Sequence, residues 1–267
     1  MIRKPVVNGQ FYPQKKEEID DFIQKFRLQT SSQINAKGVI LPHAGYIYSG
    51  RVAIETLAKI IPKKKVIILG PNHTGLGNNF SLWPKGSWKI PSGQIEIDEK
   101  LAETILSKGD LIKEDYLAHS QEHSIEVQLP IINYFFSEFK FVPICCRQAD
   151  ITIYREIATQ IFESIKEVKT DILLIASTDL THYEADQVAR KKDRLVMEAI
   201  IDLDEEELLQ RVENKNITMC GEAPVAIAIA CLKKMGARKS QIILYQTSAD
   251  TLGNSESVVG YGGMVIN

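Results

Sequence analysis

The alternation of short apolar runs with longer stretches of helical period is the feature that most constrains the fold of this chain. The apolar runs are rich in β-branched residues, and the stretches between them repeat apolar residues with the period of an amphipathic helix. The expected strands are residues 38–41, 65–69, 139–144, 171–176, 241–246 and 257–266. The expected helices are about 16–27, 50–61, 97–108, 121–135, 152–168, 185–200, 203–213 and 222–235.

Such alternation predicts an α/β fold with a mixed, mostly parallel central sheet and helices on both of its faces. The segment FSLWPKGSW, residues 80–88, contains a turn at Pro84-Lys85-Gly86 and predicts a small hairpin on top of this sheet. No low-complexity linker, internal repeat or shift in composition divides the 267 residues. We therefore expect one domain over residues 1–267.

Charge and hydropathy exclude several classes of function. The formal net charge is −2 with both signs interspersed, so the chain lacks the basic footprint of a nucleic-acid-binding protein. No apolar stretch approaches the roughly 20 residues that cross a bilayer, and the N-terminal residues lack the apolar core of a secretory signal. Four cysteines, two of them adjacent (Cys145 and Cys146), in a long chain rich in core residues fit a reducing compartment. We expect a cytoplasmic protein.

Three of the five histidines follow an apolar run within a few residues. His43 comes after Val39-Ile40-Leu41 and Pro42, His73 follows VIILGPN, and His182 follows ILLIASTDLT. In open α/β sheets the ligand crevice lies outside the carboxyl ends of the strands. If the three strands are parallel neighbours, their imidazoles converge on one rim. For any one of them alone, a loop histidine that is hydrogen-bonded to the backbone is the ordinary interpretation.

Cys220 lies directly before a run of strong helical character. The positive end of a helix dipole stabilises a thiolate, which suits a metal ligand or a nucleophile and predicts a low pKa. The alternative is a small buried apolar residue, the usual fate of a free cysteine. Glu222 could cap the same helix or serve the site. Cys231 is expected in the core. Cys145 and Cys146 end a strand, which fits either a structural or a functional role, and we interpret them as structural.

The motifs LPHAGYIYSG, LGPNHTG, AHSQEHSIEVQLP, STDLTHY and MCGEAP follow one another in this order, after FYP near the N-terminus. Together they resemble the Memo family, which is similar in fold to the extradiol-type non-haem iron dioxygenases of the protocatechuate 4,5-dioxygenase class. The resemblance covers essentially the whole chain. It implies a three-layer α/β/α sandwich with a pocket at the strand ends, in agreement with the placement of the histidines.

The resemblance also implies a metal site. His43, His73 and Cys220 match the metal-coordinating positions, and His182 with Asp179 matches the acid/base position of the dioxygenases. The dioxygenases complete their site with a carboxylate, whereas Cys220 stands at the corresponding position here. Two imidazoles and a thiolate suit iron, copper or zinc, while two histidines and one carboxylate are the oxygen-activating set. The resemblance therefore implies the fold of the dioxygenases for this chain, but not their reaction.

The remaining two histidines allow a rival interpretation. His119-Ser120-Gln121-Glu122-His123 matches H-x-x-E-H, a pattern that in a helix places both histidines on one face of a zinc peptidase. Ser120, however, looks like an N-cap, which would leave His119 outside the helix. We expect that His119 and His123 do not share a metal and that Glu122 and His123 line or support the crevice. Further lining residues are expected among nearby tyrosines: Tyr46, Tyr48 and Tyr183.

Three functions follow from these features. The first is a metal-binding redox protein that uses iron or copper, with zinc as a possible metal, in which His182 exchanges protons with a bound small molecule. The second is a binding module that holds a peptide or an anionic ligand in the same crevice without catalysis. The third is a zinc-dependent hydrolase that uses the HSQEH motif. The resemblance further implies an association with a radical-SAM protein and an AMMECR1-like protein in microbes.

Overall fold

The computed structural model describes residues 1–27 and 33–267. Its centre is a nine-stranded sheet with four adjacent parallel strands. In spatial order these are β2 (Gly38–Leu41), β9 (Leu173–Ser177), β3 (Lys65–Pro71) and β8 (Lys140–Cys146). The three strands predicted to carry histidines, β2, β9 and β3, are therefore parallel neighbours, as expected.

Antiparallel pairing extends this parallel centre on both sides. Next to β2 lies β12 (Val258–Ile266), which also pairs with β11 (Ser240–Thr247) and with the short β10 (His182–Glu184). Next to β8 lies the antiparallel β4 (Phe80–Leu82), and the two-residue β7 (Lys113–Glu114) pairs with β4 in parallel. The prediction of a mixed sheet with a parallel core is confirmed.

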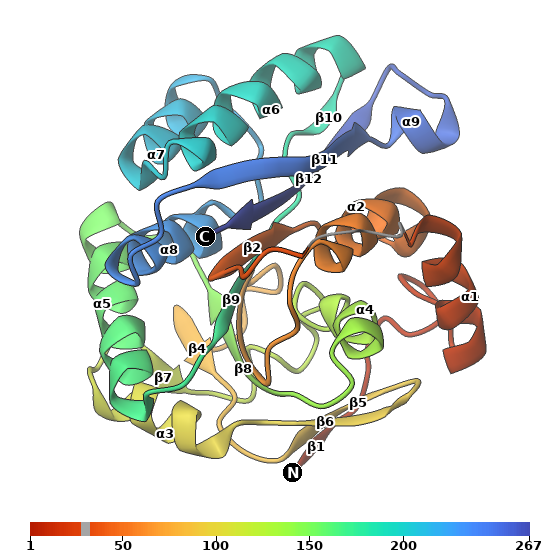
Figure 1. Ribbon diagram of the computed structural model, residues 1–267. Coiled ribbons are helices and arrows are strands. Elements are labelled where there is room, and N and C mark those ends of the chain that lie inside the picture. Colours follow the sequence, from red (N-terminus) through yellow and green to blue (C-terminus); the bar gives the residue numbers. More distant parts are fainter. Residues whose placement is uncertain (28–32) are drawn as a thin grey trace.

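Helices cover both faces of the sheet (Figure 1). One face carries α1 (Lys16–Phe26), α2 (Tyr46–Ala58) and α4 (Gln128–Phe135). The other face carries α3 (Glu99–Ser107), α5 (Ile151–Val168) and α8 (Glu222–Lys234). Beside β11 and β12 lie α6 (Asp186–Ile201), α7 (Glu205–Asn214) and the four-residue α9 (Ala249–Leu252). The predicted α/β/α layering is confirmed.

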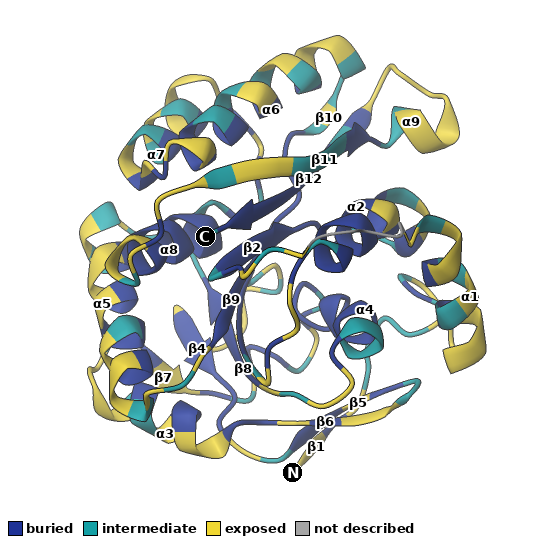
Figure 2. Ribbon diagram, viewed as in Figure 1, coloured by how far each residue is buried: buried dark blue, intermediate teal, exposed yellow. Residues whose placement is uncertain are grey.

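The core follows the sheet. Figure 2 shows the central strands buried along their length, while the outer faces of the surrounding helices are exposed. Strands covered on both faces read as continuous apolar runs, and Val66–Leu69 of β3 are fully buried. The α8 helix is apolar on nearly every side because it lies between β9 and the helices α5 and α7.

Two expected elements differ from the structure. The predicted hairpin over residues 80–88 is wrong, because Phe80–Leu82 join the main sheet beside β8. The hairpin consists instead of β5 (Ser87–Ile90) and β6 (Gly93–Glu96), which form a separate three-stranded sheet with β1 (Ile2–Arg3). Gly86, whose φ of +92° disfavours other residues, connects the two parts.

The predicted helix 121–135 begins only at Gln128. Residues 119–127 form turns, because the Glu122 carboxylate accepts the backbone N–H groups of His123 and Ser124. Ser120 does not cap a helix, since its hydroxyl donates to the Leu117 carbonyl. A local side chain thus replaces the first helical turns with a compact loop at the carboxyl edge of the sheet.

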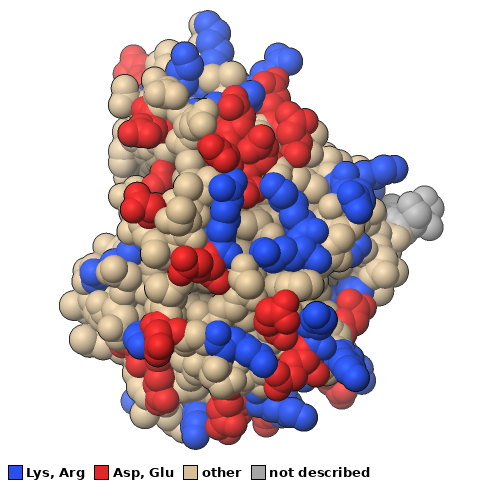
Figure 3. All heavy atoms as spheres, turned by 90° about the vertical axis from the view of Figure 1, so that its left-hand side faces the viewer, with Lys and Arg blue, Asp and Glu red and all other residues tan. Residues whose placement is uncertain are grey.

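The surface matches the mixed charge of the sequence. Basic and acidic side chains alternate over the face that carries α5 and α7 (Figure 3). Among the described residues, no helix combines the length and apolarity required to cross a membrane.

Candidate metal centre

The carboxyl edge of the parallel strands carries the cluster of polar residues. His43 follows β2 after Pro42, His73 follows β3, and Asp179 follows β9 by two residues. Parallel neighbouring strands end at the same edge, so their loops meet there. The loop that contains Glu122 and His123 reaches this edge beside Gly70 of β3. A Cβ atom at Gly70 would lie 2.6 Å from the Ser124 hydroxyl, so only glycine permits this approach.

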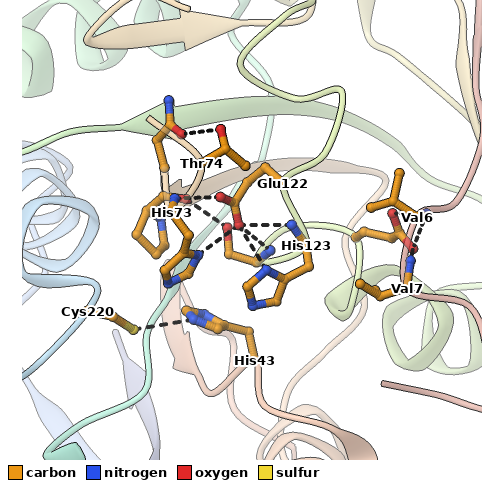
Figure 4. Close-up of polar contacts among 12 residues, drawn as sticks. Val6, Val7, His43, His73, Thr74, Glu122, His123 and Cys220 are labelled. Atoms are coloured by element: carbon orange, nitrogen blue, oxygen red, sulfur yellow. Dashed lines mark hydrogen bonds and ion pairs between the residues drawn. The ribbon is translucent and has the colours of Figure 1, made fainter. Parts of the chain in front are cut away.

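Three imidazoles form the centre of the site. His43, His73 and His123 each offer a ring nitrogen within 4.8 Å of the others (Figure 4). The ring centroids lie 5.2 Å apart for His43 and His73, and 4.7 Å apart for His73 and His123. Two nitrogens bound to one tetrahedral zinc ion lie about 3.4 Å apart. Small side-chain rotations would therefore bring all three onto a common metal ion.

The contacts of the Nδ1 atoms orient two of these rings. His73 Nδ1 lies 2.9 Å from Glu122 Oε1, and the His73 backbone N–H donates to Oε2 of the same carboxylate. These contacts outweigh the effect of burial and lower the pKa of Glu122 to about 2, so it is ionised and can only accept. His43 Nδ1 lies 2.9 Å from the Ser177 hydroxyl. Both rings thus turn Nε2 toward the cluster. A carboxylate behind a metal-binding histidine is a common arrangement in metal sites.

The electrostatics keep His43 ready to bind a metal. Burial lowers the pKa of His43 well below its usual value, and the neighbouring His73 and His123 lower it further. Burial also lowers the pKa of His123. For His73 burial acts in the same direction, but the Glu122 carboxylate dominates and raises the pKa. Metal ligation requires neutral imidazoles, so His43 and His123 are in the competent form at neutral pH.

Cys220 lies beside the cluster, 3.3 Å from His43 Nε2. A tetrahedral metal ion shared by a histidine and a cysteine holds the two atoms about 3.5 Å apart. The approach depends on Gly221, since a Cβ atom there would lie 2.4 Å from Thr178 Cβ at the end of β9. Burial raises the pKa of the Cys220 thiol. The low pKa expected from the helix dipole is therefore wrong.

Asp179 and His182 flank this arrangement. Asp179 Oδ1 accepts the backbone N–H groups of His43 and Ala44, and its own N–H donates to Cys220 Sγ at 3.2 Å. Burial raises the pKa of Asp179 to about 6. His182 Nδ1 lies 2.8 Å from the Thr218 carbonyl, an acceptor, so it carries the proton and leaves Nε2 free. The third ring in contact with His43 and His73 is His123 rather than His182.

The predicted lining residues occupy different environments. Tyr46 is buried and donates to the Val127 carbonyl, Tyr48 is half-buried, and Tyr183 is 79% exposed beside the His182 ring. Glu122 is buried behind His73 and His123. Glu222 is half-buried and lines a separate hollow of about 700 Å³ between α5 and α7.

The H-x-x-E-H pattern does not assemble as a zinc site. His119 is fully buried, with Nε2 2.9 Å from the Ser81 carbonyl and Nδ1 3.3 Å from Cys145 Sγ. Burial lowers the pKa of His119 to about 4. Cys145, Cys146 and Cys231 are buried free thiols, as expected for structural cysteines.

Sequence reasoning assigned His123 only to the lining, and it missed Ser177 and Gln128. Gln128 Nε2 lies 2.8 Å from the Ser177 hydroxyl, which in turn contacts His43. Both residues stand out in the sequence as polar positions inside or beside apolar runs, LLIAS and IEVQLP. Buried polar side chains need partners, which is a signal that could have found them.

The fold and the site define an α/β protein with a histidine cluster, able to hold a metal ion, at the carboxyl ends of its parallel strands. A family profile described as Memo-like protein matches residues 3–265. A MEMO1 family protein of Methanopyrus kandleri is 41% identical to the chain, and the match covers 99% of this chain and 99% of that protein. A MEMO1 family protein of Aquifex aeolicus is 40% identical, and the match covers 99% of this chain and 98% of that protein. The chain belongs to the Memo-like family.

Among solved structures, an uncharacterised protein from Escherichia coli K12 has a similar fold. Its TM-score is 0.54 at 10% sequence identity, and the match covers 85% of this chain and 99% of that one. At this identity the likeness concerns the fold alone.

Proposed function

We propose that this chain binds one transition-metal ion, iron or copper, and acts as a metal-dependent redox protein on a small molecule. The observation that carries the proposal is the cluster of three imidazoles whose ring nitrogens lie within 4.8 Å of one another. Imidazole suits iron, copper and zinc, and a thiolate adds preference for copper(I).

His43 and His73 would hold the metal through Nε2, with Cys220 and His123 as the further donors. A redox-active ion in this position would supply one-electron chemistry to a bound molecule. His182 keeps its Nε2 lone pair free, so this nitrogen would take up or return a proton. Asp179 would position the His43 backbone and the Cys220 sulfur through its own hydrogen bonds.

Zinc is the second candidate metal, because three imidazoles are also the donor set of some zinc enzymes that activate water. The observation that favours it is the inclusion of His123 in the cluster. This hydrolytic alternative does not need His119, whose ring nitrogens both have other partners.

Metal analysis of protein purified without a chelating tag tests the proposal, followed by anaerobic reconstitution with ferrous iron and competition titration with copper(I). We expect one metal ion per chain in the wild type and in Cys231→Ser, and a loss of at least tenfold in affinity in His43→Ala and His73→Ala. Stoichiometric zinc that resists exchange, with hydrolase activity, would favour the second candidate. Absence of tight binding of any of the three metals would refute both.

A further inference from the structure

The hydroxyl group of Ser177, at the end of β9, has three polar neighbours. Its Oγ atom lies 2.8 Å from the Ser124 carbonyl oxygen, 2.8 Å from Gln128 Nε2 and 2.9 Å from His43 Nδ1. Ser177 is fully buried, so no water competes for these contacts. The hydroxyl therefore links the loop before α4 to the histidine that follows β2.

The protons in this group can be assigned from the partners. A serine hydroxyl donates one hydrogen bond and accepts up to two. A backbone carbonyl only accepts, so the single Ser177 proton goes to Ser124. Gln128 Nε2 also lies 2.8 Å from the Pro42 carbonyl, which fixes this atom as the amide nitrogen and makes it a donor to Ser177.

The third contact must then be a hydrogen bond that Ser177 accepts. His43 Nδ1 consequently carries a proton, and in a neutral imidazole this leaves the lone pair on Nε2. That nitrogen lies 3.3 Å from Cys220 Sγ, at the inner side of the cluster. The reverse tautomer would turn the Ser177 proton toward His43 and leave the buried Ser124 carbonyl without this donor, which is unfavourable.

We infer that Ser177 is a positioning residue that holds His43 in the tautomer with the proton on Nδ1 and so reserves Nε2 for metal binding. Gln128 supports it by filling the second acceptor position of the hydroxyl. The tautomer itself requires no metal, whereas its use rests on the proposed function. Glu122 serves His73 with a charged acceptor, while His43 receives a neutral one.

Ser177→Thr and Ser177→Val make a matched pair, because the two new side chains have nearly the same shape and only threonine keeps the hydroxyl. The first readout is nitrogen-15 NMR of the His43 ring in the metal-free protein at neutral pH. We expect the proton on Nδ1 in the wild type and in Ser177→Thr, and a larger share on Nε2 in Ser177→Val. The second readout is metal affinity, expected to fall about 10- to 100-fold in Ser177→Val relative to Ser177→Thr.

Ser164→Ala is the structural control, since Ser164 is equally buried and its hydroxyl donates to a carbonyl within α5. Urea unfolding of every variant separates loss of the fold from loss of the orientation of the His43 ring. If Ser177→Val does not fold, Ser177→Ala replaces it. A wild-type His43 protonated on Nε2 would overturn the inference whether or not metal binds. The expected tautomers without any metal binding would support the positioning role and refute the proposed function.

Discussion

The Glu122 carboxylate holds two of the three clustered histidines at once. It accepts the ring N–H and the backbone N–H of His73, and the backbone N–H groups of His123 and Ser124. The motif suggested a general base or a lining residue, but a carboxylate with this many donors is a support for its neighbours. Its exposed fraction of 1% leaves it no route to a substrate.

We expect Glu122→Gln to weaken metal binding about 10- to 100-fold, because the charge that orients and strengthens His73 as a ligand is lost. Competition titration with a chelator measures this change. Glu55→Gln is the control, since Glu55 is also buried but pairs with Arg51 on its own helix. Equal affinities in the two variants would show that His73 does not depend on Glu122.

The role of the thiol can be tested by comparing Cys220, which precedes α8, with Cys231, which lies within α8. Cys220 contacts His43, whereas Cys231 is buried within the helix. We expect Cys220→Ser to lower the affinity for copper(I) by at least tenfold and Cys231→Ser to leave it unchanged, because thiolates select copper(I) more strongly than imidazoles do. We further expect Cys220→Asp to shift preference toward ferrous iron. The affinities are measured by titration against a copper(I) chelator. Equal copper(I) affinities in the wild type, Cys220→Ser and Cys231→Ser would exclude Cys220 from the site.

Among the helices, Glu205 of α7 forms ion pairs with two other helices. Its buried carboxylate accepts from Arg155 Nε of α5 at 2.9 Å and from Lys233 Nζ of α8 at 2.8 Å. The α8 helix begins two residues after Cys220, so this contact supports the element that brings the thiol to the cluster. The neighbouring Glu206 also pairs with Arg155 but is exposed.

Glu205→Gln should lower the free energy of unfolding by about 1–2 kcal/mol at neutral pH, since both basic partners are partly solvated. Burial acts to raise the pKa of Glu205, but Lys233 and Arg155 outweigh it and the pKa lies below 4.5. The stabilisation is therefore complete above that value and is lost as the pH falls through the lowered pKa.

Urea unfolding between about pH 7 and pH 3 should accordingly show a difference between wild type and Glu205→Gln that narrows at the acid end. Glu206→Gln, the exposed control, should change stability by less than about 0.5 kcal/mol at any pH. A constant difference across the range would mean that the Glu205 charge does not stabilise the fold.

For the whole molecule, the cluster joins loops that follow strands far apart in the sequence. A ligand that binds only the folded chain stabilises it by mass action, by about 2.7 kcal/mol at 100 times its Kd. We expect the bound metal to raise Tm by about 5–10 °C for a chain of this length. Calorimetry with and without a chelator measures the shift. The shift in Tm should be smaller in His43→Ala and persist in Cys231→Ser, and an equal shift in both would place the metal elsewhere.

Most strands and helices, and the edge of the sheet at which the site lies, could be predicted from the residues alone. Strand 38–41 agrees with the structure residue for residue. His43 and His73 follow β2 and β3, two parallel strands on either side of β9. Strands and helices can be predicted because β-branched runs and helical periods are patterns within a few residues. The edge that carries the site can be predicted because the carboxyl ends of parallel strands meet at the same edge of a sheet.

The side chains that complete the cluster could not be predicted, because contacts between distant segments bring them together. His123 belongs to the cluster because the Glu122 carboxylate accepts backbone N–H groups of its own loop, so that α4 begins later in the chain than predicted. In addition, Gly70 allows this loop to approach β3 closely. Ser177 and Gln128 are 49 residues apart. The contact of Ser177 with His43 exists only once β9 and β2 are paired. Side-chain hydrogen bonds between distant segments leave no periodic pattern in a sequence, so the partner of each histidine had to come from the fold.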